Sequence, residues 1–456
     1  MITAAQENER MLARILGISE EEAAQKLYRK VCITHAGGES AIFARELREQ
    51  IERTVHVVDD ATCDLEVIVG AIPRGVSRER LFIWSQPDGV FASRTAPSGQ
   101  ADMVPLHGLQ TMIAACLACG VVLHRLIDQL PVPEYRDPFT IRFDALGATR
   151  SVLEAPIIVK DTVLIGAGGV ANGFLRGARH LTIQGELEVT DPKLVGSGNP
   201  NRCLYFDQND VGHPKAQRLC DKAQPDFQNL RLKPLNQTFS KVAATKGRVR
   251  RVLVTTDSRP VRRSIQKELP LEVLDASTTE ASEVVVHSHR QPTSGACLAC
   301  IYRHIPDENA RAKDIANGLG IDVSDVISGE LISERVAHNI ARTHPTLSVS
   351  ALVGVAFDSL FKQLCGEQAL RTPTGAQVLA PFAFVSNLAG ALLALELARF
   401  DSPAANPTQS NYLNLSPWSS PHARVRSRRA REPDCEFCSR SHSMQTLRLV
   451  WPEYRL

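Results

Sequence analysis

Four cysteines in two Cys-x-x-Cys pairs are the residues of this chain with the plainest chemical use. Cys297 and Cys300 lie in the run GACLAC, and Cys435 and Cys438 lie in EPDCEFCSR. Two such pairs can present four thiolates tetrahedrally, which is the geometry of structural Zn²⁺ sites. A shared zinc ion would tie the C-terminal tail to the middle of the chain. We therefore predict a closed structural Zn²⁺ site rather than a catalytic one.

A glycine turn follows a buried strand pattern in the middle of the chain. Gly166, Gly168 and Gly169 stand between the apolar run DTVLI and the start of a helical pattern. Backbone N–H groups and the helix dipole can hold phosphate at such a turn. The turn alone leaves ATP and NAD open, because GAGGVA also fits the dinucleotide fingerprint Gly-x-Gly-x-x-Ala and Asp191 lies 25 residues after Gly166, where a ribose-binding acid is expected.

The polar residues that follow Asp191 favour ATP. Asn199, Arg202 and Lys215 come after it at intervals for which a nicotinamide site has no use. A reaction between a nucleoside triphosphate and a carboxylate joins two anions, so it needs cations that neutralise charge and hold the pair together. Arg202 and Lys215 can cover phosphate oxygens, and Asp257, after the strand pattern RVRRVLVTT, can hold Mg²⁺. Either cation taken alone could equally be an ordinary loop residue.

This set of motifs resembles the ubiquitin-activating-enzyme family, which includes ThiF-type relatives in bacterial thiamine and molybdopterin synthesis. The resemblance covers roughly residues 155–300 and 370–440. It implies that Asp191 holds the ribose, that Asn199, Arg202 and Lys215 handle the phosphates, and that Asp257 binds Mg²⁺. It also implies the two Cys-x-x-Cys pairs around a closing helix. Many members carry a second acid two residues after the first, where this chain has Lys193. The shared motifs are the glycine turn Gly166 to Gly169, Asp191, Asn199 with Arg202, Gly212 with Lys215 and Ala216, and Asp257 with Arg262.

Cys365 is the candidate nucleophile. In relatives that form a thioester, the resemblance places the catalytic cysteine between the first Cys-x-x-Cys pair and the closing strand and helix. The run FKQLCGEQALRTPTGAQ has that placement. A thiolate on such a loop could take over an acyl group from an adenylate. The alternative is a small apolar residue that ends a helix. The long helical pattern inserted before it favours an enzyme that forms a thioester and recruits a partner.

The other cysteines are expected to be structural and reduced. Cys116 and Cys119 lie in a continuous apolar helix pattern that is typical of a core, and Cys203 and Cys220 are interpreted in the same way. A cytosolic chain would keep its thiols reduced. His287 and His289, just before the first cysteine pair, are expected to be strand-end residues.

Strand patterns that alternate with helical patterns must position these residues. They predict an α/β fold with a Rossmann-like, mostly parallel sheet. The strand-like runs DLEVIVGAI and RLFIW and the apolar helix GLQTMIAACLACGVVLHRLIDQL indicate a further α/β domain in front, without a glycine-rich phosphate turn. We find no internal repeat. The expected domains are an inactive adenylation-like domain at 1–150, an adenylation domain at 151–300, a helical insertion at 301–370, a closing strand and helix at 371–400, and a loop with a zinc-binding tail at 401–456.

Composition limits the partners. The formal net charge of +2 is too small to predict nucleic acid as the main partner, and the basic run ARVRSRRAR is interpreted as a solvated connector. The N-terminus has no signal-peptide pattern, so we expect a cytoplasmic protein. The apolar stretch from Val378 to Leu395 contains Pro381 and Asn387, so it is expected in a core rather than in a membrane.

The prediction is an ATP-dependent adenylyltransferase that activates the C-terminal glycine of a ubiquitin-like protein and passes it through Cys365 to a conjugating enzyme. The architecture resembles the activating enzymes of bacterial ubiquitin-like conjugation systems, some of which serve in antiphage defence. In this family the inactive half often supplies an arginine to the ATP site, and Arg45 and Arg48 are candidates, with a solvated helix face as the alternative. Other functions left open are a sulfur-carrier adenylyltransferase without a thioester, an NAD-binding oxidoreductase and a silent nucleotide-binding scaffold. A homodimer is left open as well.

Overall fold

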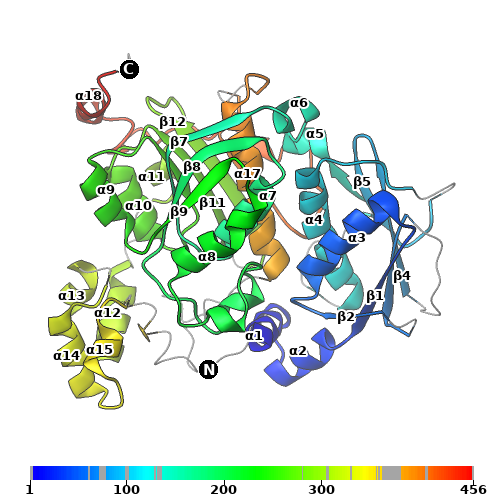
Figure 1. Cartoon of the computed structure of the whole chain (residues 1–456), viewed down its shortest axis with the longest axis horizontal. Coiled ribbons are helices and arrows are strands. Elements are labelled where there is room, and N and C mark those ends of the chain that lie inside the picture. The colour runs from blue at the N-terminus through cyan, green and yellow to red at the C-terminus, as the bar shows by residue number, and fades with distance from the viewer. Residues whose placement is uncertain are drawn as a thin grey trace.

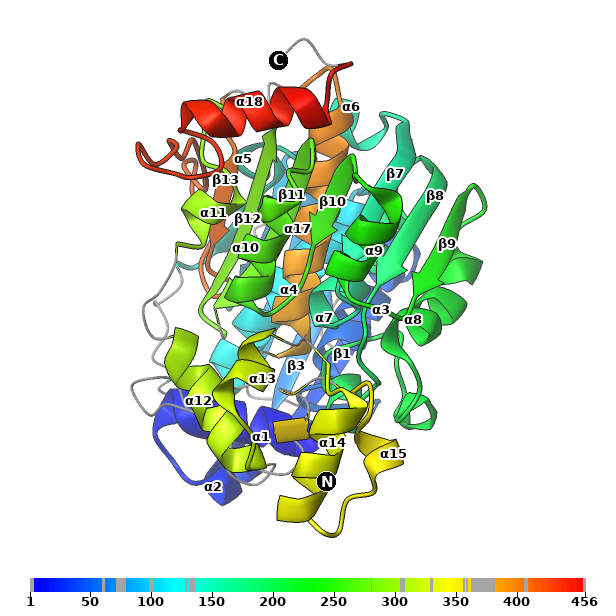
Figure 2. The ribbon, with the colours of Figure 1, turned by 90° about the vertical axis from the view of Figure 1, so that its left-hand side faces the viewer.

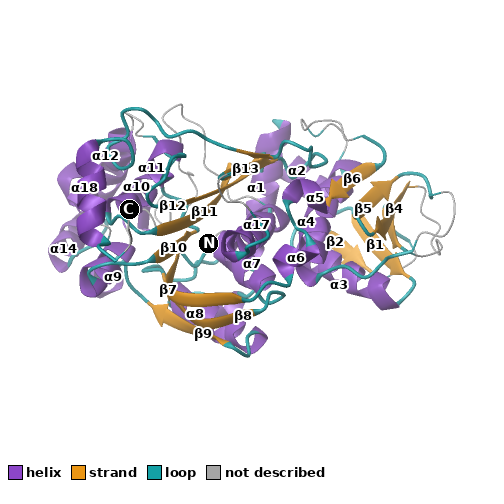
Figure 3. Ribbon diagram, turned by 90° about the horizontal axis from the view of Figure 1, so that it is seen from above, coloured by secondary structure: helices purple, strands orange, loops and turns teal. Residues whose placement is uncertain are grey.

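Two β-sheets with a layer of long helices between them make up the body of the molecule (Figures 1 and 3). The expected fold class, a mixed α/β protein with parallel-rich sheets, is confirmed. The structure is a computed structural model that describes residues 4–59, 62–70, 79–97, 102–127, 130, 136–279, 281–303, 308–328, 331–355, 357, 360–361, 382–405 and 409–453.

The larger sheet carries the motifs predicted to bind nucleotide. Its strand order is β14-β13-β12-β11-β10-β7-β8-β9, in which β7 to β11 run parallel and β12 to β14 run antiparallel. The chain builds outward from β7 in one direction and then restarts at β10 on the other side of β7, so the sheet has a topological switch point between these two strands. The strands are β7 (Ile157–Ile165), β8 (Ile183–Thr190), β9 (Leu230–Leu235), β10 (Arg251–Val254), β11 (Glu272–Thr279), β12 (Glu283–Arg290), β13 (Tyr412–Leu415) and β14 (Arg426–Ser427).

Helices cover both faces of this sheet. On the face turned toward the reader in Figure 2, α9, α10 and the short α11 pack on an apolar cluster that includes Phe239, Ile265 and Leu298. The opposite face is covered by α7 and α17, which belong to the main core. The bounds are α7 (Gly169–Ala178), α8 (Lys215–Ala223), α9 (Phe239–Lys246), α10 (Arg259–Lys267), α11 (Leu298–Ile301), α17 (Ala383–Asp401), α18 (Ser441–Val450) and the short turns η1 (Asn199–Asn201), η2 (Gln208–Asp210) and η3 (Gln224–Asp226).

The N-terminal region forms the second sheet, with strand order β2-β1-β3-β4-β5-β6. Strands β1 to β4 are parallel, and β5 and β6 are antiparallel. The bounds are α1 (Ala4–Leu16), α2 (Glu20–Leu27), β1 (Lys30–His35), α3 (Gly38–Ile51), β2 (His56–Val58), β3 (Leu65–Val69), β4 (Glu79–Gln86), β5 (Gly89–Ser93), α4 (Gly108–Leu126), β6 (Phe139–Arg142), α5 (Phe143–Leu146) and α6 (Arg150–Leu153).

The two halves repeat one topology. In each, a central parallel strand is followed by a helix, the chain then builds to one side and returns to the other, and antiparallel strands and a long apolar helix complete the unit. The series β1-α3-β2-β3-β4-β5-α4-β6 thus parallels β7-α7-β8-β10-β11-β12-α17-β13. The statement that the chain has no internal repeat is therefore wrong. The repeat is hidden in the sequence because the second half adds β9, the cysteine pair and a helical segment between corresponding elements.

Helices α3 and α4 of the N-terminal half pack against α7 and α17 of the other half in the middle of the molecule (Figure 3). Helices α7 and α17 approach so closely that a Cβ on Gly390 would lie 2.2 Å from the backbone nitrogen of Phe174. A Cβ on Gly173 would lie 2.6 Å from Cα of Asn387. Small residues allow this backbone contact, which a larger side chain would prevent. Across the halves, the buried Arg176 of α7 pairs with Glu46 of α3 at 3.2 Å and contacts Glu49.

Two helices, α4 and α17, are long and apolar enough to cross a membrane. Both are almost entirely enclosed by the rest of the protein. Their apolar character is explained by this position between two sheets, where a helix needs no polar face. The part of the stretch from Val378 to Leu395 that lies in α17 is thus a core helix, as expected.

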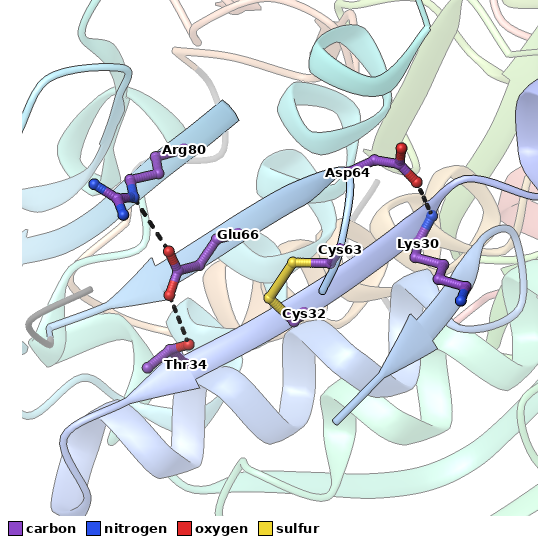
Figure 4. Close-up of a disulfide and its surroundings, with 7 residues drawn as sticks. All are labelled: Lys30, Cys32, Thr34, Cys63, Asp64, Glu66 and Arg80. Carbon is purple, nitrogen blue, oxygen red and sulfur yellow. Dashed lines mark hydrogen bonds and ion pairs between the residues drawn. A yellow bond between two sulfur atoms is a disulfide. The ribbon is translucent and has the colours of Figure 1, made fainter. Parts of the chain in front are cut away.

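The expectation that the chain keeps its thiols reduced is wrong for two cysteines. Cys32 of β1 and Cys63, just before β3, form a disulfide (Figure 4). The neighbouring strands are also joined by polar contacts. The carboxylate of Asp64 accepts the backbone N–H of Lys30 at 2.7 Å, and the buried Glu66 pairs with Arg80 at 3.2 Å. The parallel pairing of β1 with β3 brings the two cysteines together, although 31 residues separate them in sequence.

The segment after α11 is helical, as expected, and has an apolar cluster of its own that includes Leu319, Val336 and Ile340. Its helices are α12 (Glu308–Leu319), α13 (Val323–Ser328), α14 (Glu334–Thr343) and α15 (Val349–Leu352). Figure 2 shows these helices at the same end of the molecule as α1 and α2.

Residues 401–456 are more regular than the expected loop and tail, because β13 and β14 extend the large sheet and α18 packs on it. Arginines of the basic run contact the rest of the chain. Arg426 pairs with the buried Glu396, the guanidinium of Arg429 lies 4.7 Å from the ring centroid of Tyr412, and Arg431 donates to the carbonyl of Cys438 at 3.2 Å. Most of the run is exposed, Arg429 and Arg431 included, as expected of a solvated connector, but Arg426 is drawn into the fold by its ion pair.

Candidate nucleotide and zinc sites

The glycine turn lies at the switch point of the large sheet. Ile165 of β7 is in register with Val254 of β10 and with Thr190 of β8, so the turn after β7 meets the carboxyl ends of both neighbours. Ligands of open α/β sheets bind in this crevice. Gly166 has φ of +98°, a left-handed conformation that favours glycine. A Cβ on Gly168 would touch nothing within 4 Å, so the turn presents open space at the N-terminus of α7.

Asp191 fastens this turn. It is 7% exposed and follows β8 directly. One carboxylate oxygen accepts the backbone N–H of Ala167 at 2.8 Å, and the other accepts that of Lys193 at 2.8 Å. Each carboxylate oxygen has a second lone pair, so Asp191 can hold the turn and still accept a ribose hydroxyl.

Arg202 and Lys215 converge on the same place from the segment between β8 and β9. A Cβ on Gly169 would lie 3.2 Å from Cγ of Arg202, which puts that side chain beside the start of α7. Lys215 opens α8 and donates its backbone N–H to the carbonyl of Lys193 at 2.9 Å. Burial lowers the pKa of Lys215, the nearby Asp191 opposes that shift, and Lys193 and Arg202 add to it. A half-buried cluster of cations around one carboxylate is suited to a polyanion.

Asn199 and Asp257 have different surroundings. The side-chain oxygen of Asn199 accepts the backbone N–H of Gly196 at 2.8 Å, so this residue shapes its own turn. Asp257 follows β10 and is exposed at the carboxyl end of the sheet, beside the strand that carries the glycine turn. Asp257 therefore lies at the edge of the sheet where the crevice opens. The roles of Asn199 and Asp257 toward a nucleotide stay predictions.

The N-terminal half supports the segment that carries Arg202. Asn8 of α1, which is 2% exposed, accepts the side-chain N–H of the buried Asn201 at 2.9 Å. Arg53, just after α3, donates to the carbonyl of Pro200 at 3.0 Å. Among the candidates for a donated arginine, Arg48 instead pairs with Asp59 at 2.6 Å and Arg45 is exposed. Arg53 is the N-terminal arginine that the structure brings to this segment in their place.

Two buried polar residues of the site were missed in the sequence. Asn172, which is 0% exposed, donates its amide to the carbonyl of Gly168 at 2.9 Å and accepts the N–H of Tyr205 at 3.1 Å. Ser386 of α17 faces the start of α7, because its Oγ would lie 3.0 Å from a Cβ on Gly169. An asparagine inside the first turn of an apolar helix was the signal that could have identified Asn172.

The four predicted zinc ligands come together. Sγ of Cys297 lies 3.7 Å from Sγ of Cys300 and 3.6 Å from that of Cys435, and Sγ of Cys300 lies 3.5 Å from that of Cys438. Four sulfurs about 2.3 Å from a tetrahedral Zn²⁺ would lie about 3.8 Å apart. The backbone N–H of Glu432 points to Sγ of Cys300 at 3.4 Å, as in the outer shell of metal sites. The buried four-cysteine cluster therefore fits zinc.

The remaining predicted residues divide into two groups. Cys365 lies outside the described residues. Cys116, Cys119, Cys203 and Cys220 are buried in the core, where burial raises the pKa of each thiol. His287 and His289 lie in the second half of β12, His289 one residue before its end as expected, and burial lowers the pKa of both, to about 4 for His287.

A glycine turn at the switch point of a Rossmann-like sheet is typical of a nucleotide-binding protein. Residues 159–437 match the model of the ThiF family, and residues 1–149 match the model described as the E1 N-terminal domain. Because the first match covers more than half of the chain, the protein belongs to the ThiF family. ThiF proteins bind ATP, and the chain is an enzyme of this E1-like adenylyltransferase kind.

Solved structures give weaker similarities. E. coli MccB in complex with MccA-N7isoASN is 14% identical over 63% of this chain and 68% of that one, with a TM-score of 0.37. E. coli tRNA N6-threonylcarbamoyladenosine dehydratase, TcdA, is 13% identical over 57% of this chain and 94% of that one, with a TM-score of 0.29. A comparison with curated proteins finds no match.

Proposed function

We propose that this protein uses ATP to adenylate the C-terminal glycine carboxylate of a ubiquitin-like protein, in the cytoplasm. The convergence of Asp191, Arg202 and Lys215 on the glycine turn carries the proposal. Family membership supports adenylation and favours ATP over the NAD or silent-scaffold alternatives. The match to an E1 N-terminal domain supports a protein substrate of the ubiquitin-like kind.

In the proposed reaction, the substrate carboxylate attacks the α-phosphorus of ATP, and the bond to the β-phosphate oxygen breaks. The products are an acyl adenylate and pyrophosphate. Arg202 and Lys215 would neutralise the phosphate oxygens, the backbone of Gly168 and Gly169 would hold them, and Asp191 would accept the ribose hydroxyls. Asp257 would hold Mg²⁺, which supplies further positive charge against the phosphates. Asn199 would keep the Arg202 segment in shape.

A second proposed step transfers the acyl group to Cys365 as a thioester, with release of AMP, and then to a conjugating enzyme. The long helical segment that separates α11 from α17 supports it, because a direct adenylyltransferase needs no such insertion. A sulfur-carrier adenylyltransferase without the thioester is the second candidate function. A role in bacterial antiphage conjugation is the biological setting that we propose.

The test of adenylation is ATP–pyrophosphate exchange that depends on a small protein ending in glycine. Lys215→Ala is expected to reduce exchange at least about a hundredfold, because an uncompensated phosphate charge in the transition state costs several kcal/mol. Lys30→Ala, at an exposed position of the N-terminal sheet, is the matched control. Exchange that survives Lys215→Ala would contradict the site assignment.

The thioester is tested separately by intact mass after incubation with ATP and the ubiquitin-like protein. An adduct that thiols remove and that disappears in Cys365→Ala is expected. The same adduct in Cys365→Ala would exclude this cysteine as the nucleophile.

A further inference from the structure

Helix α10 connects the cysteine cluster to the turn that carries Asp257. It begins after Ser258, whose hydroxyl accepts the N–H of Val261 at 3.4 Å. Its other end is fastened to the first cysteine pair, because the side chain of Gln266, which is 0% exposed, accepts the N–H of Leu298 at 3.1 Å. One helix therefore has the candidate Mg²⁺ carboxylate at its start and the cysteine pair at its side.

Arg262 reaches the Asp257 turn from within this helix. Its guanidinium is 2% exposed and donates to the carbonyl of Thr256, the residue before Asp257, at 2.5 Å. The same group pairs with Asp275 and donates to the carbonyl of Ala276 at 3.1 Å. A planar guanidinium with fixed donor directions can hold several acceptors at once, so Arg262 joins the turn to β11.

Tyr302 orients Arg262 from the side of the cysteine cluster. It lies two residues after Cys300 and is 8% exposed. Its hydroxyl donates to Asp275 at 2.7 Å and accepts from Arg262 at 3.1 Å, and the guanidinium lies 4.6 Å from the centroid of its ring. The chain of contacts thus runs from Cys300 through Tyr302 and Arg262 to the backbone of Thr256.

We propose that Tyr302 and Arg262 are positioning residues that hold the Asp257 turn in place, so that the cysteine cluster sets how tightly ATP binds together with Mg²⁺. The inference rests on the proposed function. It adds a role for the cysteine cluster beyond fastening the tail. Because Tyr302 and Asp257 lie far apart in the sequence, the sequence alone does not reveal this connection.

The experiment measures nucleotide affinity of the zinc-loaded full chain with a fluorescent ATP analogue, in Mg²⁺ and in EDTA. Tyr302→Phe keeps the ring and removes only the hydroxyl. It is expected to weaken binding about tenfold in Mg²⁺ and to leave binding in EDTA unchanged, since the hydroxyl bonds to charged groups are worth about that factor. Zinc content, measured by colorimetric release, is expected to stay the same.

Arg262→Lys keeps the positive charge beside Asp275 but loses the planar guanidinium that bonds to several acceptors at once. It is therefore expected to behave like Tyr302→Phe. It decides the question if Tyr302→Phe does not fold. The matched control is Lys267→Gln, at an exposed position near the end of the same helix, which leaves the contacts of Thr256, Arg262 and Tyr302 intact.

The outcomes separate the two proposals. If Asp257→Ala abolishes the Mg²⁺-dependent part of binding while Tyr302→Phe and Arg262→Lys leave it unchanged, the positioning role is overturned and the adenylation site stands. If the wild-type chain shows no Mg²⁺-dependent binding of nucleotide, the proposed function itself fails. A loss in Lys267→Gln as large as that in Arg262→Lys would also overturn the positioning role, because it would show a general effect of loosening α10.

Discussion

In the two halves of the molecule, the same three residues lead from the central strand into the helix that follows it. In the N-terminal half, Ala36-Gly37-Gly38 connect β1 to α3, and in the other half Ala167-Gly168-Gly169 connect β7 to α7. The N-terminal half therefore has a glycine turn of its own at the corresponding place, which the sequence pattern did not single out. Its turn was overlooked because the strand KVCITH is short and mixed in polarity, whereas β7 is longer and ends on the apolar run VLI.

What differs is the surroundings of the two turns. His35 uses its ring nitrogen to accept the N–H of Gly37 at 3.2 Å, whereas Ala167 gives its N–H to the carboxylate of Asp191. Between β2 and β3 the chain passes directly back to the sheet, whereas the segment after β8 is long and supplies Arg202 and Lys215. A glycine turn at a helix start is thus not sufficient for a phosphate site. The added segment makes the difference between the halves.

The halves also differ in the cysteine cluster, and its removal is expected to give the largest effect. The described residues of the N-terminal half contain no such tetrad. Cys300→Ser, or chelation of zinc, is expected to cost several kcal/mol of stability, because binding energy of a structural zinc is folding energy. Hydrogen exchange should accelerate first in β12 to β14 and α18. If hydrogen exchange accelerated equally in β1 to β4, the cysteine cluster would stabilise both halves alike.

Replacement of one glycine in each of the two turns is expected to give the next largest effect. Gly168→Ala places a methyl group in the open space of the turn without a steric clash or a positive φ, so the protein should fold normally and lose at least about tenfold in ATP affinity. Gly37→Ala meets no neighbour either, but φ at Gly37 is +97°. It should cost about 1 kcal/mol of stability and leave ATP affinity unchanged.

Titration calorimetry and thermal unfolding of the two variants check this prediction. ATP affinity that falls equally in both variants would mean that the N-terminal turn also binds nucleotide. Unchanged affinity in Gly168→Ala would move the phosphates away from the α7 turn.

The smallest expected effect is a change in the stability of the nucleotide-free protein when Lys215 is replaced. Because the pKa of Lys215 is lowered in the folded protein, its charged form is better solvated in the unfolded chain. Lys215→Met should therefore stabilise the nucleotide-free protein slightly near neutral pH. The gain should shrink as pH rises toward about 10.4, the pKa of an unfolded lysine.

Urea unfolding at several pH values measures this gain. Lys30→Met, at an exposed lysine of the N-terminal half, is the control and should change stability little at any pH. A Lys215→Met variant that is less stable at neutral pH would show that the cation cluster is favourable without its anion.

Much of the fold follows from local pattern. The apolar strand before Gly166, the long apolar helix α4 and the helical segment after α11 all have sequences whose periodicity agrees with their final structure. The zinc tetrad was also predictable, because Cys-x-x-Cys spacing is a local requirement of a tetrahedral thiolate site. The sequence alone thus determined the class of fold, the glycine turn and the four cysteines.

Only the tertiary structure decided which distant residues meet. The disulfide of Cys32 with Cys63, the support of Arg202 by Asn8 and Arg53, and the link from Tyr302 to Asp257 each join segments whose spacing in sequence has no regular pattern. Their contacts depend on the order of strands and on helix crossings such as that of α7 with α17, which are set by packing of the whole core. The repeat of the two halves, obscured by insertions, became visible for the same reason.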